Sequence, residues 1–304
     1  MVVNRLHKII KFPLIQKYYL IFVFLIGFGY YKNGFVPYLN NYNTFGQMLY
    51  VFILPIGCFL LGSLFDVFFK NKDLFNSKFY SLLFIMLIPL QSNFFLVLGI
   101  LVLLLSIYNF LSLKKIDNKT NIIVLAKLLL VFFLILFKSY DYQNRLEISG
   151  LFQYSLLDSL IGYNVGCCYS TSVLILILGV IILLFDEYYK KEIPLYSYGF
   201  YLLTLFLYAF FKQDMKIILV NMFSSSILFG IIFVGTLSNF TPCTKKKKFL
   251  YSLILGFSIL PFSLLVNFNE GVYISIVLAN FILNLGDLVF KNSRVLLKKG
   301  KVGN

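Results

Sequence analysis

The chain has 304 residues, of which 60% are hydrophobic and only 13% charged, and its mean hydropathy is +0.87. Because soluble domains contain about 25% charged residues and one core of this size leaves much surface in water, this composition excludes a soluble enzyme and predicts a membrane protein. The net charge of +15 would suggest nucleic-acid binding in a soluble chain, but in a membrane protein the positions of the basic residues decide its meaning.

Apolar runs long enough to cross a bilayer recur along the whole chain. About 20 helical residues cross a hydrocarbon core of about 30 Å. The sequence predicts ten such spans, at residues 13–32, 46–69, 77–91, 93–113, 120–138, 168–186, 193–211, 216–237, 249–268 and 271–290. We therefore expect an all-α, polytopic transmembrane helical bundle, with residues 1–304 forming a single integral membrane domain. The first span follows no cleavable signal and is expected to stay.

Lysine and arginine gather in alternate connections between these spans. Such residues mark the cytoplasmic side. The basic groups on that side include the Lys245–Lys248 run and the tail from Lys291 to Lys301, whereas the other side holds Lys32, Lys138, Arg145 and a few more. Both termini are therefore predicted to be cytoplasmic. The charge reflects topology and contact with the lipid bilayer, at about 1 kcal/mol per charge near anionic headgroups, and no nucleic-acid partner is expected.

Two predicted spans end in similar six-residue sequences, each of which begins with an aspartate. Asp66 begins Asp-Val-Phe-Phe-Lys-Asn at the end of the second span, and Asp287 begins Asp-Leu-Val-Phe-Lys-Asn at the end of the tenth. One interpretation is a polar helix end whose lysine extends to the headgroups. The other is a pair of carboxylates at the entrance to an ion path or a cofactor site.

Lys127 lies inside the fifth predicted span, about two turns from its start. A charge within the bilayer needs a partner, a water-filled cavity or access to the interface. Lys127 could therefore snorkel to the surface, or pair with a phosphate inside the bundle.

The longest break runs from Lys138 to Cys167 and is predicted to hold a short interfacial or re-entrant segment. It leads into Gly162–Ser172, in which glycines allow close approach of the backbone. The hydroxyls of Ser170, Thr171 and Ser172 open a helix whose first amide groups favour an anion such as a phosphate. Ordinary helix capping explains the same hydroxyls. Capping and turn chemistry also explain the hydroxyl-rich exit at Thr236–Thr244.

Metal and nucleophile chemistry find little support in the sequence. The four cysteines, Cys58, Cys167, Cys168 and Cys243, follow no metal spacing, and the single histidine, His7, lies outside every apolar run. A cysteine peptidase would need a base beside its thiol. We therefore predict no metal site and no catalytic residue.

From Leu156 to Pro194 the order of features resembles the RnfD/NqrB family, whose members are membrane subunits of the Rnf electron-transport complex and of the related sodium-translocating NADH:quinone reductase. That family carries a glycine-rich stretch, a Gly-Glu-Thr-Ser step, a long apolar helix and a basic turn closing on Ile-Pro. The counterparts here are Gly162 to Gly166, Thr171-Ser172, the run to Leu184, and Lys190 to Pro194.

A second block agrees in the same order, and the resemblance covers about residues 45–291. The family's Leu-Phe-Gly, Ser-Pro-Val-Thr-Lys-Lys, Glu-Gly and Asn-to-Asp patterns correspond to Leu228–Gly230, Thr241–Lys246, Glu270-Gly271, and Asn280 with Asp287. Asn121 to Lys127 is similar to the family's Asn-Pro-Ala-Leu-Val-Gly-Arg step at its two ends.

The chain departs from the family at the flavin. The family holds an FMN through a threonine in a Ser-Gly-Ala-Thr segment after the fifth span, but here no threonine occurs between Thr120 and Thr171. Ser149 or Ser155 could accept a phosphoester in principle, yet covalent attachment is not expected, so any FMN is expected to be non-covalent. Ser170 replaces a family glutamate and Leu237 a family aspartate, which weakens the expectation of a redox centre.

The resemblance implies a divergent subunit of an Rnf-like translocase that couples electron flow between reduced ferredoxin and NAD to movement of Na⁺ or H⁺. Other membrane and peripheral subunits would be its partners, in the plasma membrane of a prokaryote. Around a flavin phosphate we expect Gly166, Thr171 and Ser172, with Lys127 as counter-charge and Asn121 nearby. Asp66 and Asp287 are the candidates for the ion path.

Two alternatives stay open. A stand-alone secondary transporter would show inverted repeats and helices broken at mid-membrane. A structural membrane subunit without a redox role is favoured by the missing threonine.

Overall fold

The computed structural model is helical, and no strand occurs among the residues it describes. These residues are 13–69, 75–89, 92–113, 121–137, 156–163, 166–215, 218, 221–237, 241–242, 244–266 and 268–300, with side chains described as far as 286. Ser149 and Ser155 lie outside them, as does most of the long break after the fifth span. The prediction of a re-entrant segment there is therefore tested only at its end.

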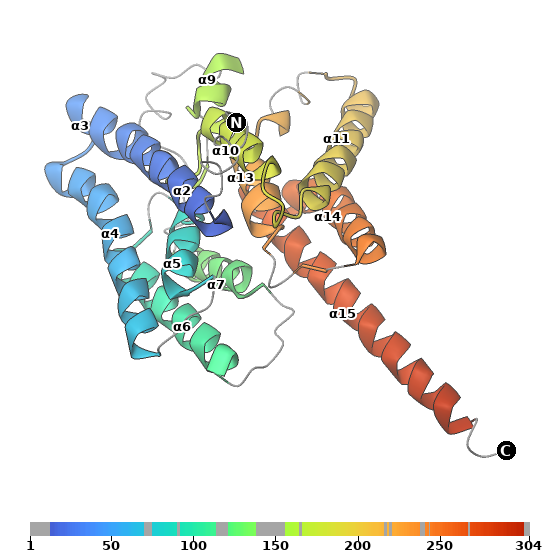
Figure 1. The fold of residues 1–304 in the computed structure, drawn as a ribbon. Coiled ribbons are helices and arrows are strands. Elements are labelled where there is room, and N and C mark those ends of the chain that lie inside the picture. The colour runs from blue at the N-terminus through green and yellow to red at the C-terminus, as the bar shows by residue number, and fades with distance from the viewer. Residues whose placement is uncertain are drawn as a thin grey trace, which may run out of the picture.

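Each predicted span contains a helix, and together the helices form a bundle (Figure 1). The first half holds α2 (Leu14–Tyr30), a π-helical turn η1 (Tyr31–Phe35), α3 (Val36–Leu39), α4 (Phe45–Phe68), α5 (Ser77–Met86), α6 (Phe94–Leu113) and α7 (Ile122–Leu136). The second half holds α9 (Leu156–Ile161), α10 (Val173–Leu184), α11 (Glu192–Lys212), α13 (Ser225–Phe229), a second π-helical turn η2 (Gly230–Val234), α14 (Lys245–Leu265) and α15 (Phe268–Gly300).

Five helical segments are long and apolar enough to cross a membrane by length and composition: Leu14–Leu39, Phe45–Phe68, Phe94–Leu113, Glu192–Lys212 and Lys245–Leu265. Four more are apolar but shorter: Ser77–Met86, Ile122–Leu136, Val173–Leu184 and Ser225–Val234. Large apolar side chains such as Phe68, Phe95 and Phe211 remain at least four-fifths exposed. Such surface is stable against lipid rather than water. The predicted helical membrane bundle is confirmed.

Short polar side chains begin several helices. The side-chain oxygens of Thr44, Asn76, Asn121 and Ser172 each accept a hydrogen bond from the backbone N–H three residues later. Thr44 and Gln47 complete a reciprocal capping box at the start of α4. Each cap satisfies one of the amides that the first turn leaves without an intrahelical acceptor, typically worth about 1 kcal/mol. Ser172 therefore plays the capping role that the sequence left open.

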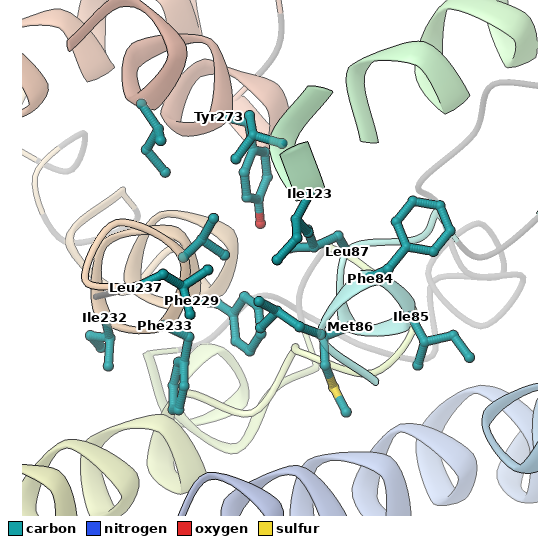
Figure 2. Close-up of a cluster of buried hydrophobic side chains, with 14 of the residues drawn as sticks. Phe84, Ile85, Met86, Leu87, Ile123, Phe229, Ile232, Phe233, Leu237 and Tyr273 are labelled. Carbon is teal, nitrogen blue, oxygen red and sulfur yellow. The ribbon is translucent and has the colours of Figure 1, made fainter. Parts of the chain in front are cut away.

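Aromatic rings fill the core between the two halves. The rings of Phe229 and Phe233 stack with their centroids 4.9 Å apart, and Phe22 of α2 lies 5.7 Å from Phe233. Figure 2 shows the end of α5, α7, the α13–η2 segment and α15 meeting in one buried cluster, into which Tyr273 directs its hydroxyl. The labelled members are Phe84, Ile85, Met86, Leu87, Ile123, Phe229, Ile232, Phe233, Leu237 and Tyr273.

Three helices are shorter than the spans that the sequence predicted. The run 77–91 is helical only to Met86, 168–186 only from Val173, and 216–237 chiefly over Ser225–Val234. Since a helix rises 1.5 Å per residue, ten residues reach about 15 Å, half of the hydrocarbon core. The bundle therefore contains helix ends in its interior, each joined to non-helical backbone.

Close packing of α11 against α14 depends on Gly256. A Cβ atom at this position would lie 2.5 Å from Cβ of Phe200 and 2.6 Å from the backbone oxygen of Ser197. Neither neighbour is a flexible side-chain end, so the two helices would have to separate.

Gly256→Ala is expected to lower the free energy of unfolding by about 1–3 kcal/mol through overpacking. Gly199→Ala is the matched control, because in the described structure no atom lies within 4 Å of a Cβ built there; it should be neutral or stabilising by about 0.5–1 kcal/mol through helix propensity. Thermal unfolding of both purified variants in detergent measures the difference. Equal midpoints would contradict this packing.

Candidate functional site: a buried polar centre

Lys127 of α7 lies in the middle of the bundle with 0% of its surface exposed. Its ammonium group is 3.4 Å from Oε1 of Glu270 in α15, and it donates a hydrogen bond of 2.8 Å to the backbone oxygen of Leu87. The same Nζ lies 4.2 Å from the ring centroid of Tyr273 and 3.5 Å from Sγ of Cys167. We call these groups the polar centre.

The polar centre joins elements that are far apart in sequence. Asn121 fixes the start of α7: its Oδ1 accepts from Val124 N–H, and its Nδ2 donates to the backbone oxygen of Val234 at the end of η2, 3.2 Å away. Glu270 lies in the first turn of α15 and Tyr273 one turn later. The ammonium of Lys127 thus bridges the C-terminal end of α5 and the N-terminal part of α15.

Residues 166–172 pass through the same region as non-helical backbone, all of them buried. Helix ends hold this segment. The N–H of Cys168 donates to the backbone oxygen of Ile88, and the hydroxyl of Ser170 donates to that of Met86, both at 2.8 Å. Non-helical backbone is tolerated at membrane depth only where it is covered by protein or lines a cavity. Here the segment and the end of α5 satisfy each other's polar groups.

Hydroxyl groups from α13 approach the segment from another side. A Cβ built on Gly166 would lie 3.0 Å from Oγ of Ser225. The hydroxyl of Ser226 donates to Oδ1 of Asn269 at 2.7 Å. Oγ of Ser225 and Oγ1 of Thr171 are buried and have no hydrogen-bond partner within the described part of the chain. Buried hydroxyls without partners are uncommon and call for an explanation.

A buried ion pair of this kind is costly. Desolvation of the two charges offsets much of their attraction, so apolar residues of similar size often stabilise as well or better. Ionisable groups inside a membrane protein are therefore functional-site candidates with a named partner. Lys127 and Glu270 form such a pair.

The structure brings together three of the five residues predicted to surround a flavin phosphate. Gly166, Thr171 and Lys127 all border this region, whereas Ser172 and Asn121 serve as caps of α10 and α7. The interpretation of Lys127 as a snorkelling residue is wrong, because its side chain is fully buried. The alternative, pairing with a phosphate inside the bundle, stays a prediction; in this structure the partner of Lys127 is the carboxylate of Glu270.

A flavin phosphate does not fit beside Gly166 as these side chains are arranged. The hydroxyl of Ser225 occupies the space in front of Gly166, and the Lys127 ammonium is engaged by Glu270 and Leu87. Ser225 and Lys127 would both have to move. The flavin contacts predicted for these residues stay a prediction.

Asp66 has a structural role in the fold. Its carboxylate accepts hydrogen bonds from the backbone N–H groups of Ser77 at 2.7 Å and Lys78 at 3.3 Å, which open α5. Negative charge is favourable at a helix N-terminus. Asp287 lies in α15, and its side chain is outside those described. An ion-path role is untested for both residues.

Sequence reasoning missed Glu270 as a site residue. It stood immediately before the predicted tenth span, 271–290, and so was read only as part of a family-like Glu-Gly step. The helix begins earlier, at Phe268, which places Glu270 inside the bundle. The sequence feature that could have identified it is a carboxylate directly before one apolar run, together with a lysine inside another apolar run.

A model of the NQR2, RnfD, RnfE family matches residues 93–295. No curated protein matches the chain. The matched region, about two thirds of the chain, runs from the start of α6 into α15 and includes Lys127, Gly166 and Glu270. Asp66 and α2 to α5 precede it.

Asp66→Ala should destabilise the fold by about 1–2 kcal/mol, since it removes a charged cap and leaves two amides at the start of α5 without their acceptor. Asp66→Asn keeps one acceptor and should lose less. In a complex that transports ions, transport per folded molecule should be unchanged. Thermal unfolding together with transport normalised to folded protein measures both; an intact midpoint with abolished transport would instead assign Asp66 to the ion path.

Proposed function

Since this chain belongs to the NQR2, RnfD, RnfE family and is thus a multi-pass membrane subunit of an Rnf- or Nqr-type complex, we propose that its complex couples electron transfer from reduced ferredoxin to NAD to movement of Na⁺ or H⁺ across a prokaryotic plasma membrane. The other membrane and peripheral subunits of that complex are its proposed partners. The family match supports the type of complex, and the resemblance of motifs supports the choice of Rnf.

The Lys127–Glu270 pair is the observation that carries the ion-translocating role. Both side chains are at most 1% exposed, and they connect α7, the end of α5 and the start of α15. An ion that crosses the bundle needs a charged or polar stop within it, and interrupted helices at mid-membrane are where such stops occur. The chain's proposed contribution is therefore ion movement, which the buried ion pair supports.

The residues of the polar centre would act by changing access to Glu270. In the present arrangement the ammonium of Lys127 neutralises this carboxylate and simultaneously ties the end of α5 to α15. A shift of either helix would exchange the counter-charge at Glu270 and open the carboxylate toward one side. A ligand or redox event elsewhere in the complex can drive such a shift only if it favours one of the two arrangements.

Any flavin in this protein is proposed to be FMN held without a covalent bond. When bound, FMN supplies one- and two-electron transfer. Gly166, Thr171 and Ser172 stay the candidates around its phosphate, with Lys127 as counter-charge, provided that Ser225 and Lys127 move as described above. A structural role without flavin is the alternative.

The broken helices α5, α10 and α13 favour a second candidate function, a stand-alone secondary transporter. The two functions differ in their dependence on partners. A transporter moves its substrate when the chain is reconstituted alone, whereas a member of an electron-transport complex requires electron flow through the others.

In inverted membrane vesicles from the source cell, deletion of this chain should abolish ferredoxin-dependent NAD reduction and the accompanying ion uptake, and the wild-type chain should restore both. Glu270→Gln should retain electron transfer but lose at least about tenfold in ion uptake, because the intramembrane charge is gone. Asp66→Asn is the matched control carboxylate and should keep both. NAD reduction that is unaffected by the deletion would refute the function.

The purified chain, denatured and separated by electrophoresis, should show no flavin fluorescence in the gel, because no threonine is present between Thr120 and Thr171. Denaturation of the native protein should release free FMN into solution, as a non-covalent flavin requires. A fluorescent band would overturn the expected absence of covalent attachment, and Ser149→Ala and Ser155→Ala would then locate the bond.

A further inference from the structure

The last helix, α15, continues beyond the part of the bundle that covers its first half. Up to Asn280 the helix is well covered: Ile276 is 0% exposed and Asn280 is 4% exposed. From Phe281 to Gly286 no residue is buried. The helix nevertheless runs on to Gly300, and Figure 1 shows its C-terminal part clear of the other helices. Cover by the chain's own helices therefore ends near Asn280.

The uncovered part of α15 lies at membrane depth. The tenth predicted span ends at residue 290, and the helix shows no break at Asn280. Ten residues of helix rise about 15 Å, which is half of the hydrocarbon core. The side chains of Phe281, Ile282 and Leu285 are 57%, 40% and 45% exposed, which suits contact with lipid. About half of one membrane span thus stands outside its own bundle.

Asparagine side chains mark one face of α15 where this cover ends. Asn280 and Asn284 lie four residues apart and therefore share a face of the helix. The Nδ2 group of Asn280 is buried and has no hydrogen-bond partner in the described structure. The side chain of Asn284 is half-buried and forms no hydrogen bond with another described residue. Lipid cannot supply the missing partners.

The sequence extends this polar face toward the C-terminus. Asn284 is followed, at alternating intervals of three and four residues, by Asp287, Lys291, Arg294 and Lys298. Positions at this spacing lie on one face of a helix. A helix end surrounded by lipid would be apolar all round, whereas helices that pack together in a membrane form hydrogen bonds through polar side chains. The pattern indicates that protein covers this face of α15.

Charge argues against a second copy of this chain as the cover. In a pair related by a two-fold axis along the membrane normal, the two copies of α15 run in the same direction. The basic residues between Lys291 and Lys301 of one copy would then lie beside those of the other. Like charges placed together across an interface disfavour association. A helix from a different subunit can bring the opposite charge to this end of α15.

We propose, on the premise of the partner subunits given above, that the polar face of α15 binds a transmembrane helix of a different subunit of the complex. That helix carries amide or hydroxyl side chains at the depth of Asn280 and Asn284, and a carboxylate at the end that lies beside Lys291. The hydrogen bonds replace those that lipid cannot give, and the carboxylate fixes the depth at which the two helices pair. Lipid covers the opposite face, which includes Ile282.

Photocrosslinking in the intact complex tests this interface. A benzophenone maleimide is attached to Asn284→Cys in a chain that also carries Cys243→Ser, because the other three cysteines are buried. The label should form a cross-link to a membrane-spanning segment of another subunit, identified by mass spectrometry. Ile282→Cys is the matched control, because two residues turn the helix by about 200° and place the label on the opposite face. This control should react with lipid only.

Asn284→Leu tests the hydrogen bonds without a label. The amount of the cross-linked subunit that co-purifies per folded chain should fall by about threefold, the average effect of one interhelical hydrogen bond in a membrane. The thermal midpoint of the chain purified alone should stay unchanged, because the amide of Asn284 has no hydrogen bond within the described part of the chain. Ile282→Leu should change neither quantity.

Four outcomes would overturn this interface. They are a cross-link from position 284 to a second copy of the chain, reaction with lipid alone from both labelled positions, equal co-purification with wild type and Asn284→Leu, and a lower midpoint of Asn284→Leu in the chain alone. None of these measurements depends on ferredoxin, NAD or the transported ion. Failure of the interface would therefore leave the proposed electron transport standing, and NAD reduction that survives deletion of the chain would leave the cross-link standing.

Discussion

The need of every backbone polar group to find a partner inside the protein governs this structure. Lipid offers no hydrogen bonds, so a helix that ends within the membrane must pass its carbonyl groups to other parts of the chain. At the end of α5 the carbonyls of Met86, Leu87 and Ile88 are taken by Ser170, Lys127 and the N–H of Cys168. The buried non-helical segment and the central lysine thus supply the hydrogen-bond donors that the end of a short helix needs inside the membrane.

The ion pair adds a cost that this solution does not require. A hydroxyl group could donate a hydrogen bond to the carbonyl of Leu87 in place of Lys127, as the hydroxyl of Ser170 does to the carbonyl of Met86. A charge in that position obliges the protein to bury a carboxylate as well, and isolated buried ion pairs seldom stabilise more than apolar packing. A function in charge movement explains this cost better than stability does, and it agrees with the family to which the chain belongs.

The hydropathy pattern predicted the positions of the helices but not the residues at which several of them end. Each of the ten predicted spans contains a helix, because the apolar runs of about 20 residues reflect the thickness of the bilayer. The run that holds α5 continues through Leu87, Ile88 and Leu90, so hydropathy alone does not mark its end at Met86, although Pro89 is a local stop signal three residues later. The partners that take the freed carbonyl groups, such as Ser170 some 80 positions later, are revealed by no local pattern.

The site shows the same division. Lys127, Gly166 and Thr171 were identifiable because a charge in a span and a glycine–hydroxyl cluster are unusual in lipid. Their meeting with Glu270 and Ser225 is a tertiary fact, and Glu270 was overlooked because its helix starts three residues before the predicted boundary. Ordinary capping was one of the interpretations offered for Ser172, and the structure shows that cap; the cap made by Asn121 was not predicted.

The contrast between Asp66 and Glu270 shows how two buried carboxylates acquire different roles. The carboxylate of Asp66 accepts hydrogen bonds from backbone N–H groups at the start of α5, and these stay in place as long as the helix is intact. Glu270 is neutralised by an ammonium at the end of a flexible side chain, which a change of rotamer can withdraw. A fixed partner makes a carboxylate structural, and a removable one makes it available to an incoming ion. We therefore propose that the kind of partner, more than depth or burial, distinguishes a carboxylate that takes part in ion movement, such as Glu270, from one that caps a helix, such as Asp66.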